Sequence, residues 1–453
     1  MKTLRLLSFC LLLQAADVQA ESIAFVNVNV LPMTTETVLP GRTVIVGDGR
    51  IMAIGDVEDT VLPDGAMVVD GTDRYLMPGL AEMHGHVTGT SPQELDRLMG
   101  LYLANGVTTV RGMLGRPSHL KLREQLRGGQ VIGPRLISSG PSFNGNSVDS
   151  PEQASAMVRE QHAAGYDFLK IHPGLSREEF DAIAATAKEF GIPFAGHVPE
   201  DVGVPRALEA GIASIDHLDG YMATLMPANY DRSGGFGGFF GLFIAAQADA
   251  GKIGDIAART AEAGVWNVPT ESLFEHVAST TRPEVMVGWP EMKYMPAAQV
   301  RRWRESKEDL INDPQFDAVA AVRAIEIRRQ LILALHEAGA GLLLGSDSPQ
   351  IFNVPGFSLH RELEFLVAAE LSPYEALRTG TVNPAVFLGK ENEFGQVKVG
   401  LDADLVLLDA NPLDDISNSR RVHGVMLRSR WFSRQQLDEQ LARIARRANG
   451  PAT

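Results

Sequence analysis

The middle of the chain alternates helical stretches with short apolar runs. Most of the helical stretches end at a glycine, as at Gly106, Gly165 and Gly339, and an apolar run follows within a few residues. Glycine suits the left-handed position just past a helix end. Eight runs are strand candidates: 76–84, 107–110, 135–139, 167–172, 193–198, 214–218, 265–269 and 341–347. Eight strands alternating with helices predict an α/β fold with a (β/α)8 TIM barrel.

The two ends of the chain have a different, β-like pattern. Residues 23–30 partly alternate apolar and polar positions, and 43–46 and 51–54 flank a turn at 47–49. Similar runs return after residue 393. We therefore expect a small discontinuous β-sandwich domain from 21–75 and 393–432, a barrel from 76–392, and a C-terminal helix and tail from 433–453.

The first twenty residues have the pattern of a signal peptide. Lys2 and Arg5 precede an apolar run at 6–13, and small residues near Ala20 suit cleavage. The run is too short to span a bilayer. Export to the periplasm or the medium is therefore expected. The single cysteine, Cys10, would be removed with this segment, so the mature chain would have no thiol for a disulfide or a metal.

Composition narrows the class of protein. The chain has 453 residues, of which 45% are hydrophobic and 21% charged, enough for a large core and unlike a disordered or multi-span membrane protein. A net charge of −15 disfavours nucleic-acid binding, which depends on Lys and Arg meeting phosphates. We expect a small-molecule substrate and no stable membrane insertion. The sequence leaves open whether the protein forms a homo-oligomer.

Histidines and a carboxylate stand at the ends of several predicted strands. His84 and His86 alternate on the first strand, so both can face one metal. His197 and His217 close the fifth and sixth strands, and Asp347 closes the eighth. Barrels place their chemistry at this end of the strands. Imidazoles with a carboxylate and no thiol suit Zn²⁺ or a similar divalent ion.

Lys170, at the end of the fourth strand, is unusual beside metal ligands. Two divalent ions would repel its ammonium group. A carbamate formed with CO₂ would instead be an anion with two oxygens that can bridge two metals. The alternative is an ordinary lysine paired with a nearby acid such as Asp167, and the histidine set favours the carbamate.

These motifs resemble the amidohydrolase superfamily over nearly the whole mature chain. Residues 78–86 are similar to its first metal motif, 345–347 to its last, and 400–405 to its return into the β-domain. The chain resembles most the group around imidazolonepropionases and the Xaa-Pro or Xaa-Arg/Lys dipeptidases with a carboxylated lysine. The resemblance implies one metal on His84, His86, Lys170 and Asp347. It implies a second metal on Lys170, His197 and His217.

The expected function is hydrolysis of an amide bond in a dipeptide or an N-acyl amino acid. A metal-bridging hydroxide would attack, and Asp347 would shuttle the proton to the leaving amine. Glu200, in a His-x-x-Glu arrangement with His197, supports an alternative deaminase or cyclic amidohydrolase. A non-catalytic exported binding protein is a further alternative, although all six ligand positions are filled.

Other residues are weaker candidates for substrate contact. The sequence is extended after the sixth and seventh strands, where loops of a barrel form substrate sites. The Gly- and Phe-rich stretch 233–241 in the first extension fits either a cover over an apolar substrate group or an ordinary loop. The candidate substrate residues are His172, Tyr221, Tyr230, His276 and His360.

Overall fold

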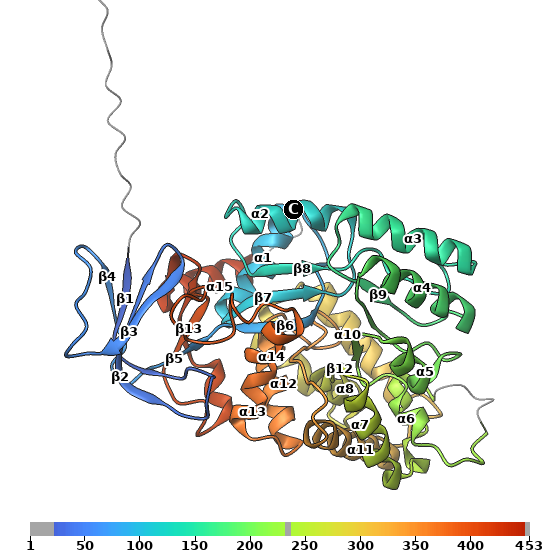
Figure 1. Cartoon of the computed structure of the whole chain (residues 1–453). Coiled ribbons are helices and arrows are strands. Elements are labelled where there is room, and N and C mark those ends of the chain that lie inside the picture. Colours follow the sequence, from blue (N-terminus) through green and yellow to red (C-terminus); the bar gives the residue numbers. More distant parts are fainter. Residues whose placement is uncertain (1–21, 232–236, 449–453) are drawn as a thin grey trace, which may run out of the picture.

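A computed structural model gives the fold of residues 22–231 and 237–448 (Figure 1). The predicted signal peptide at 1–20 lies outside these described residues, as do 232–236 and the last five residues of the predicted tail. In the described part of the chain, the model has no helix with the length and apolarity that crossing a membrane requires.

Strands from both ends of the chain form one sheet. Its order is β15-β14-β13-β5-β1-β2-β3, and β4 pairs with β1. Leu405 of the C-terminal part lies opposite Pro78 in an antiparallel pair, which joins the two ends. The strands are β1 Ile23–Val30, β2 Leu39–Gly47, β3 Arg50–Asp56, β4 Met67–Asp70, β5 Tyr75–Pro78, β13 Leu405–Leu408, β14 Val422–Leu427 and β15 Arg430–Ser433.

Parallel strands occupy the middle of the chain in two sheets. One sheet contains β6, β7 and β8, and the other contains β9 to β12. A parallel bridge between Ser139 and Phe168 connects them. The strands are β6 Leu80–Gly85, β7 Val107–Gly112, β8 Arg135–Ser138, β9 Leu169–Ile171, β10 Phe194–Gly196, β11 Ser214–Asp216 and β12 Trp266–Val268.

Two strand predictions need correction. The run 76–84 is not one strand, because it divides at Gly79 into β5 of the terminal sheet and β6 of the parallel set. A Cβ on Gly79 would lie 2.3 Å from the Thr108 side chain, so the division needs glycine. The predicted eighth strand, 341–347, forms only one isolated parallel bridge, between Leu342 and Asn267, and Ser348 just beyond the run forms another with Gly85. Its backbone turns left-handed at Asp347, with φ of 57°, and this interrupts a regular ladder.

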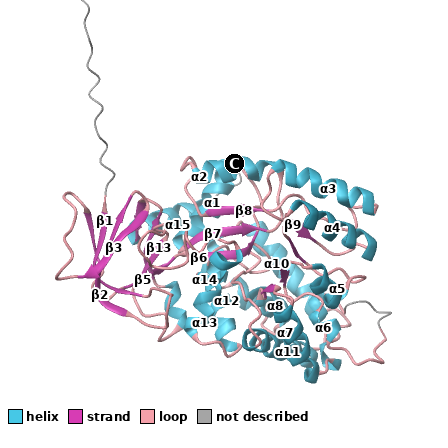
Figure 2. Cartoon of the chain, in the orientation of Figure 1, coloured by secondary structure: helices cyan, strands magenta, loops and turns pink. Residues whose placement is uncertain are grey.

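Helices surround the parallel strands (Figure 2). Gly165 and Gly191 cap α3 and α4 with φ of 81° and 67°, as the sequence pattern predicted. The helices are α1 Pro92–Ala104, α2 Pro117–Arg127, α3 Pro151–Ala164, α4 Arg177–Phe190, α5 Gly203–Ala210, α6 Tyr221–Thr224, α7 Ile253–Glu262, α8 Glu271–Ala278, α9 Pro283–Val287, α10 Ala297–Ile311, α11 Ala318–Glu337, α12 Phe357–Ala368, α13 Pro373–Thr379, α14 Val382–Phe387 and α15 Arg434–Ala448.

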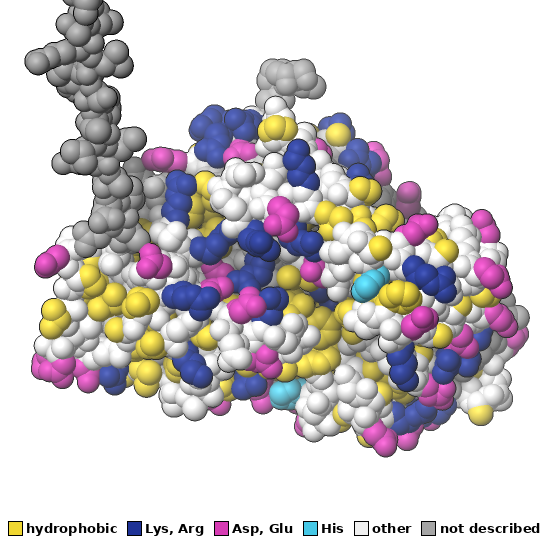
Figure 3. Space-filling model, turned by 45° about the horizontal axis from the view of Figure 1, so that its top comes forward, with side chains coloured by type: hydrophobic (Ala, Val, Ile, Leu, Met, Phe, Trp, Pro, Cys, Tyr) yellow, Lys and Arg dark blue, Asp and Glu magenta, His cyan; other side chains and the backbone are white. Residues whose placement is uncertain are grey.

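A mixed-charge junction joins the C-terminal part of the chain to β8 and α2. Arg135 of β8 donates to Glu393 at 2.8 Å and to Asp402 at 2.7 Å, and Arg428 donates to the carbonyl of Gly133. The surface in Figure 3 shows Lys and Arg side chains gathered with Asp and Glu on one face. These ion pairs add to an apolar core that the parallel strands and their helices share with Val406, Val425 and Phe432 of the terminal sheet.

Candidate active site

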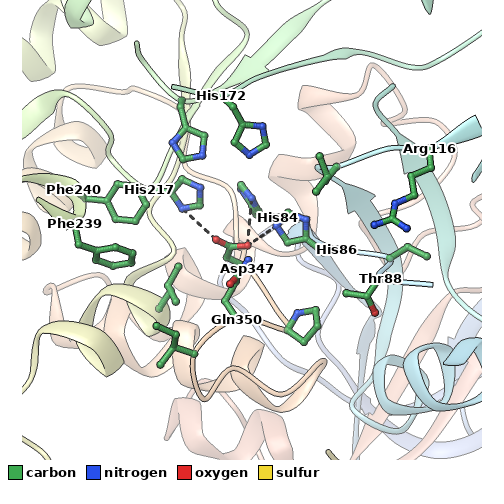
Figure 4. Close-up of a pocket in the computed structure, with 16 residues that line it drawn as sticks. His84, His86, Thr88, Arg116, His172, His217, Phe239, Phe240, Asp347 and Gln350 are labelled. Carbon is green, nitrogen blue, oxygen red and sulfur yellow. Dashed lines mark hydrogen bonds and ion pairs between the residues drawn. The ribbon is translucent and has the colours of Figure 1, made fainter. Parts of the chain in front are cut away.

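A cavity of about 410 Å³ lies at the carboxyl ends of the parallel strands. This volume falls within the usual range for small-molecule sites. Its wall includes five of the six predicted metal ligands, and Figure 4 shows several of them pointing toward one another. The five are His84, His86, His197, His217 and Asp347. The sixth, Lys170, is completely buried and does not line the cavity itself.

Asp347 is the centre of the cluster. Its Oδ1 lies 2.6 Å from His86 Nε2 and 3.6 Å from His84 Nε2, and its Oδ2 lies 3.8 Å from His217 Nδ1. The rings of His197 and His217 are 4.7 Å apart between centroids. Potential ligand atoms of His84, His86 and Asp347 all lie within 4.8 Å of one another. The cluster is therefore a possible metal site.

Unusual backbone conformations hold three of these strand ends. His217, Thr270 and Asp347 have φ of 63°, 50° and 57°, in the left-handed region. Such conformations are costly for residues with a side chain and cluster at functional sites. Here they turn the chain just after β11, two residues after β12 and at the end of the eighth run, and His217 and Asp347 line the cavity.

Polar groups lie beside the Nδ1 atoms of three of the four imidazoles. Asp216 Oδ2 lies 3.1 Å from His84 Nδ1, and Asp219 Oδ2 lies 3.0 Å from His197 Nδ1. Thr270 Oγ1 lies 2.8 Å from Nδ1 of His217. A partner on Nδ1 orients the ring and leaves Nε2 for a metal. None of these three partners was predicted from the sequence, although Asp216 and Asp219 closely flank His217 in the chain.

Burial sets the protonation of the histidines. Burial is the main cause that lowers the pKa of His84 and of His217 well below the usual value, and neighbouring cationic groups lower it further. Both rings are therefore neutral near pH 7. Neutral imidazole is the form that binds a metal.

Lys170 Nζ lies 3.5 Å from Asp216 Oδ2 in the floor beneath the cavity. Burial lowers the pKa of Lys170, while Asp216 opposes this effect. A lowered pKa favours the neutral amine, which is the nucleophilic form. Gly196 makes room for this side chain, since a Cβ there would lie 2.9 Å from Lys170 Cδ and 2.4 Å from the carbonyl oxygen of Ile171.

Of the five candidate substrate residues, only His172 lies in the cavity wall. His172 lines the cavity and stacks on His197 at 4.9 Å, and its pKa is lowered to about 2, mainly by burial. The Tyr221 hydroxyl instead bonds Thr260 and Asn267. The other candidates outside the cavity wall are Tyr230, His276, His360 and Glu200.

Several cavity residues gave no signal in the sequence. Arg116, Leu273 and Gln350 line the wall from segments with no recognisable motif. By contrast, Phe239 and Phe240 belong to the Gly- and Phe-rich stretch that the sequence did single out. Both line the wall, and the Phe240 ring stacks on His217 at 4.7 Å. Part of that stretch, 232–236, lies outside the described residues.

Comparison with known proteins identifies the family. The model of the amidohydrolase family matches residues 75–432. Ochratoxinase from Aspergillus niger is 20% identical over 409 residues, covering 75% of this chain and 71% of its own length. In structure, bottromycin amidohydrolase has a TM-score of 0.72 at 24% identity, over 94% of this chain and 91% of its own. A Xaa-Pro dipeptidase with bound methionine has a TM-score of 0.66 at 19% identity, over 91% of this chain and 100% of its own.

The family match covers most of the chain and includes all six predicted ligands. The structural similarity agrees with a TIM-barrel-like fold that carries an additional domain. Members of this family are typically metal-dependent, in keeping with the His84, His86 and Asp347 group. The chain therefore belongs to the amidohydrolase family and is a hydrolase that acts on carbon–nitrogen bonds.

Proposed function

We propose that this protein is an exported metal-dependent amidohydrolase that cleaves an amide bond in a dipeptide or an N-acyl amino acid. The observation that carries the proposal is the convergence of four imidazoles and Asp347 on one cavity. The similar structures include an amidohydrolase and a dipeptidase, and their names support cleavage of an amide bond.

The proposed metals are two divalent ions of the Zn²⁺ type. A carboxylated Lys170 would be shared between them. His84, His86 and Asp347 would complete one ligand set, and His197 and His217 the other. The donors fit this role because burial keeps His84 and His217 neutral. The Nδ1 atoms of His84, His197 and His217 also already face polar partners. Such ions lower the pKa of a water molecule and polarise an amide carbonyl.

Asp347 is the proposed proton shuttle. Its two oxygens face different histidines, so the carboxylate can take a proton from the attacking water and pass it to the leaving nitrogen. The hydroxyl of water then joins the carbonyl carbon, the carbon–nitrogen bond breaks, and an acid and an amine result. The Phe240 ring stacks against His197 and His217 and gives this side of the cluster an apolar surface.

The finer architecture is part of the same proposal. We take β6 to β12 and the run 341–347 as an eight-stranded barrel, and 21–75 with 393–432 as a discontinuous β-sandwich domain. Backbone hydrogen bonds from Met83 to Leu344 and from Leu343 to Asn267 support the eighth position. Export through residues 1–20 rests on the sequence pattern alone.

A metal assay and a substrate panel test the proposal. The purified protein should contain close to two divalent ions per chain, and a chelator should abolish hydrolysis. Dipeptides and N-acyl amino acids should release amino acids, measured alongside ammonia. Release of ammonia alone would favour a deaminase, and a protein with no metal that cleaves nothing would exclude a hydrolase of this type.

A further inference from the structure

Arg116 supplies an unused positive charge in the cavity wall. It stands just before α2 and, among the described residues that line the cavity, it is the only Lys or Arg. Arg116 is exposed, and no carboxylate of the described residues pairs with its guanidinium. By contrast, a carboxylate pairs with each of Arg111, Arg328 and Arg329, near the cavity floor and the α8–α11 contact. In the part of the wall that the structure describes, the only acid is Asp347, which already faces three histidines.

The other side of the cavity is aromatic. Phe239 and Phe240 are half-buried, and their ring centroids lie 4.3 Å apart. Leu273 adds apolar surface to the wall. Figure 4 places these two rings on one side of the His–Asp cluster and Arg116, with Thr88, on the other. The cavity thus presents an apolar surface, a hydrolytic centre and a cation in that order.

We infer that Arg116 binds the free carboxylate of the substrate, while Phe239 and Phe240 hold an apolar or aromatic group on the acyl side of the amide. This inference rests on the proposed function and narrows it to N-acyl amino acids and dipeptides with a large apolar acyl part. A guanidinium matches a carboxylate with two parallel hydrogen bonds, which fixes position as well as charge. The amide between the two groups then lies over the His–Asp cluster.

Binding of probes that cannot be hydrolysed separates this inference from turnover. N-(Benzylsulfonyl)glycine carries both an aromatic group and a carboxylate, and its sulfonamide replaces the amide. Its carboxamide, N-(benzylsulfonyl)glycinamide, removes the charge, and N-(methylsulfonyl)glycine removes the ring. Affinities of the metal-loaded protein for the three probes are measured by titration calorimetry.

The wild type should bind the benzyl acid at least about tenfold more tightly than its carboxamide, since hydrogen bonds to charged groups have this strength. Arg116→Gln should remove that preference and leave carboxamide binding unchanged, and Arg116→Lys should keep part of it. Arg159→Gln is the matched control, because Arg159 is exposed on α3 away from the cavity. Arg159→Gln should leave the affinities for all three probes unchanged.

Phe239→Ala tests the aromatic side. It should weaken both benzyl probes and leave the methyl probe unaffected. Equal binding of acid and carboxamide by the wild type would overturn the inference, as would equal losses for both in Arg116→Gln. Failure of the panel to yield any hydrolysis while the charge preference persists would refute the proposed function and leave the binding inference standing. Hydrolysis of the panel by a wild type that does not prefer the benzyl acid over its carboxamide would support the proposed function and refute the binding inference.

Discussion

Arg111 and Asp216 form a completely buried ion pair beneath the cavity, with 3.1 Å between Nη2 and Oδ1. The same guanidinium donates to the carbonyl of Met83, next to His84, and to Ser214. The other carboxylate oxygen of Asp216 faces His84 and Lys170. One pair therefore ties β6, β7 and β11 together directly below the candidate metal ligands.

Replacing Arg111 should be strongly destabilising. Arg111→Met leaves the Asp216 carboxylate buried without its cation, which costs about 3–5 kcal/mol of unfolding free energy. Urea unfolding measures this loss, and calorimetry should show weaker metal binding. Arg123→Met is the control, because Arg123 pairs with the partly exposed Asp167 at 2.8 Å. Its loss should cost about 1 kcal/mol or less, and equal costs for both variants would contradict a special role for the buried pair.

Lys170→Ala should lose metal and activity together. The variant has no amine to form the bridging carbamate, so the metal content should fall from about two ions per chain, measured by mass spectrometry. Bicarbonate with a short carboxylic acid should restore part of the activity. Lys188→Ala, at an exposed position on α4, should leave both properties unchanged. A fully active Lys170→Ala variant would show that no bridge forms there.

Asp347→Asn should separate metal binding from catalysis. The amide oxygen can still contact the histidines, so much of the metal should remain. Turnover should fall by about 10²–10⁴-fold, because the amide cannot accept the proton from the attacking water. Asp255→Asn, an exposed change on α7, serves as the control. The proton-shuttle role is excluded if Asp347→Asn turns over at the wild-type rate.

Glu362 should make folding stability depend on pH. It lies on α12 and accepts hydrogen bonds from the backbone nitrogens of Glu271 and Ser272 at the start of α8. Burial raises the pKa of Glu362 from 4.5 to about 8, against the effect of these hydrogen bonds. The folded state therefore holds the proton more tightly than the unfolded state.

The stabilisation from this proton is complete below about pH 4.5 and is lost as the pH rises through about 8. Glu362→Gln removes the titration. Its thermal unfolding midpoint should fall less than that of the wild type over this pH range. Other buried carboxyls are common to both proteins, so the difference between the two curves reports Glu362. Parallel curves would contradict the assignment.

The sequence determined the alternation of strands and helices and the ligand candidates, since both depend on local periodicity. Glycine after a helix and histidine at a strand end are short-range signals, and Gly165 and His217 occupy the positions they predicted. Division at Gly79 was missed because it depends on close contact with Thr108, a residue of another strand.

Only the tertiary structure decided which groups support and surround the ligands. Asp219 approaches His197 across 22 positions, and Glu362 reaches the start of α8 across about 90. Arg116 and Phe239 share one cavity although they lie more than 100 residues apart. Such contacts depend on how separate strands and loops pack, and no periodicity along the chain encodes them.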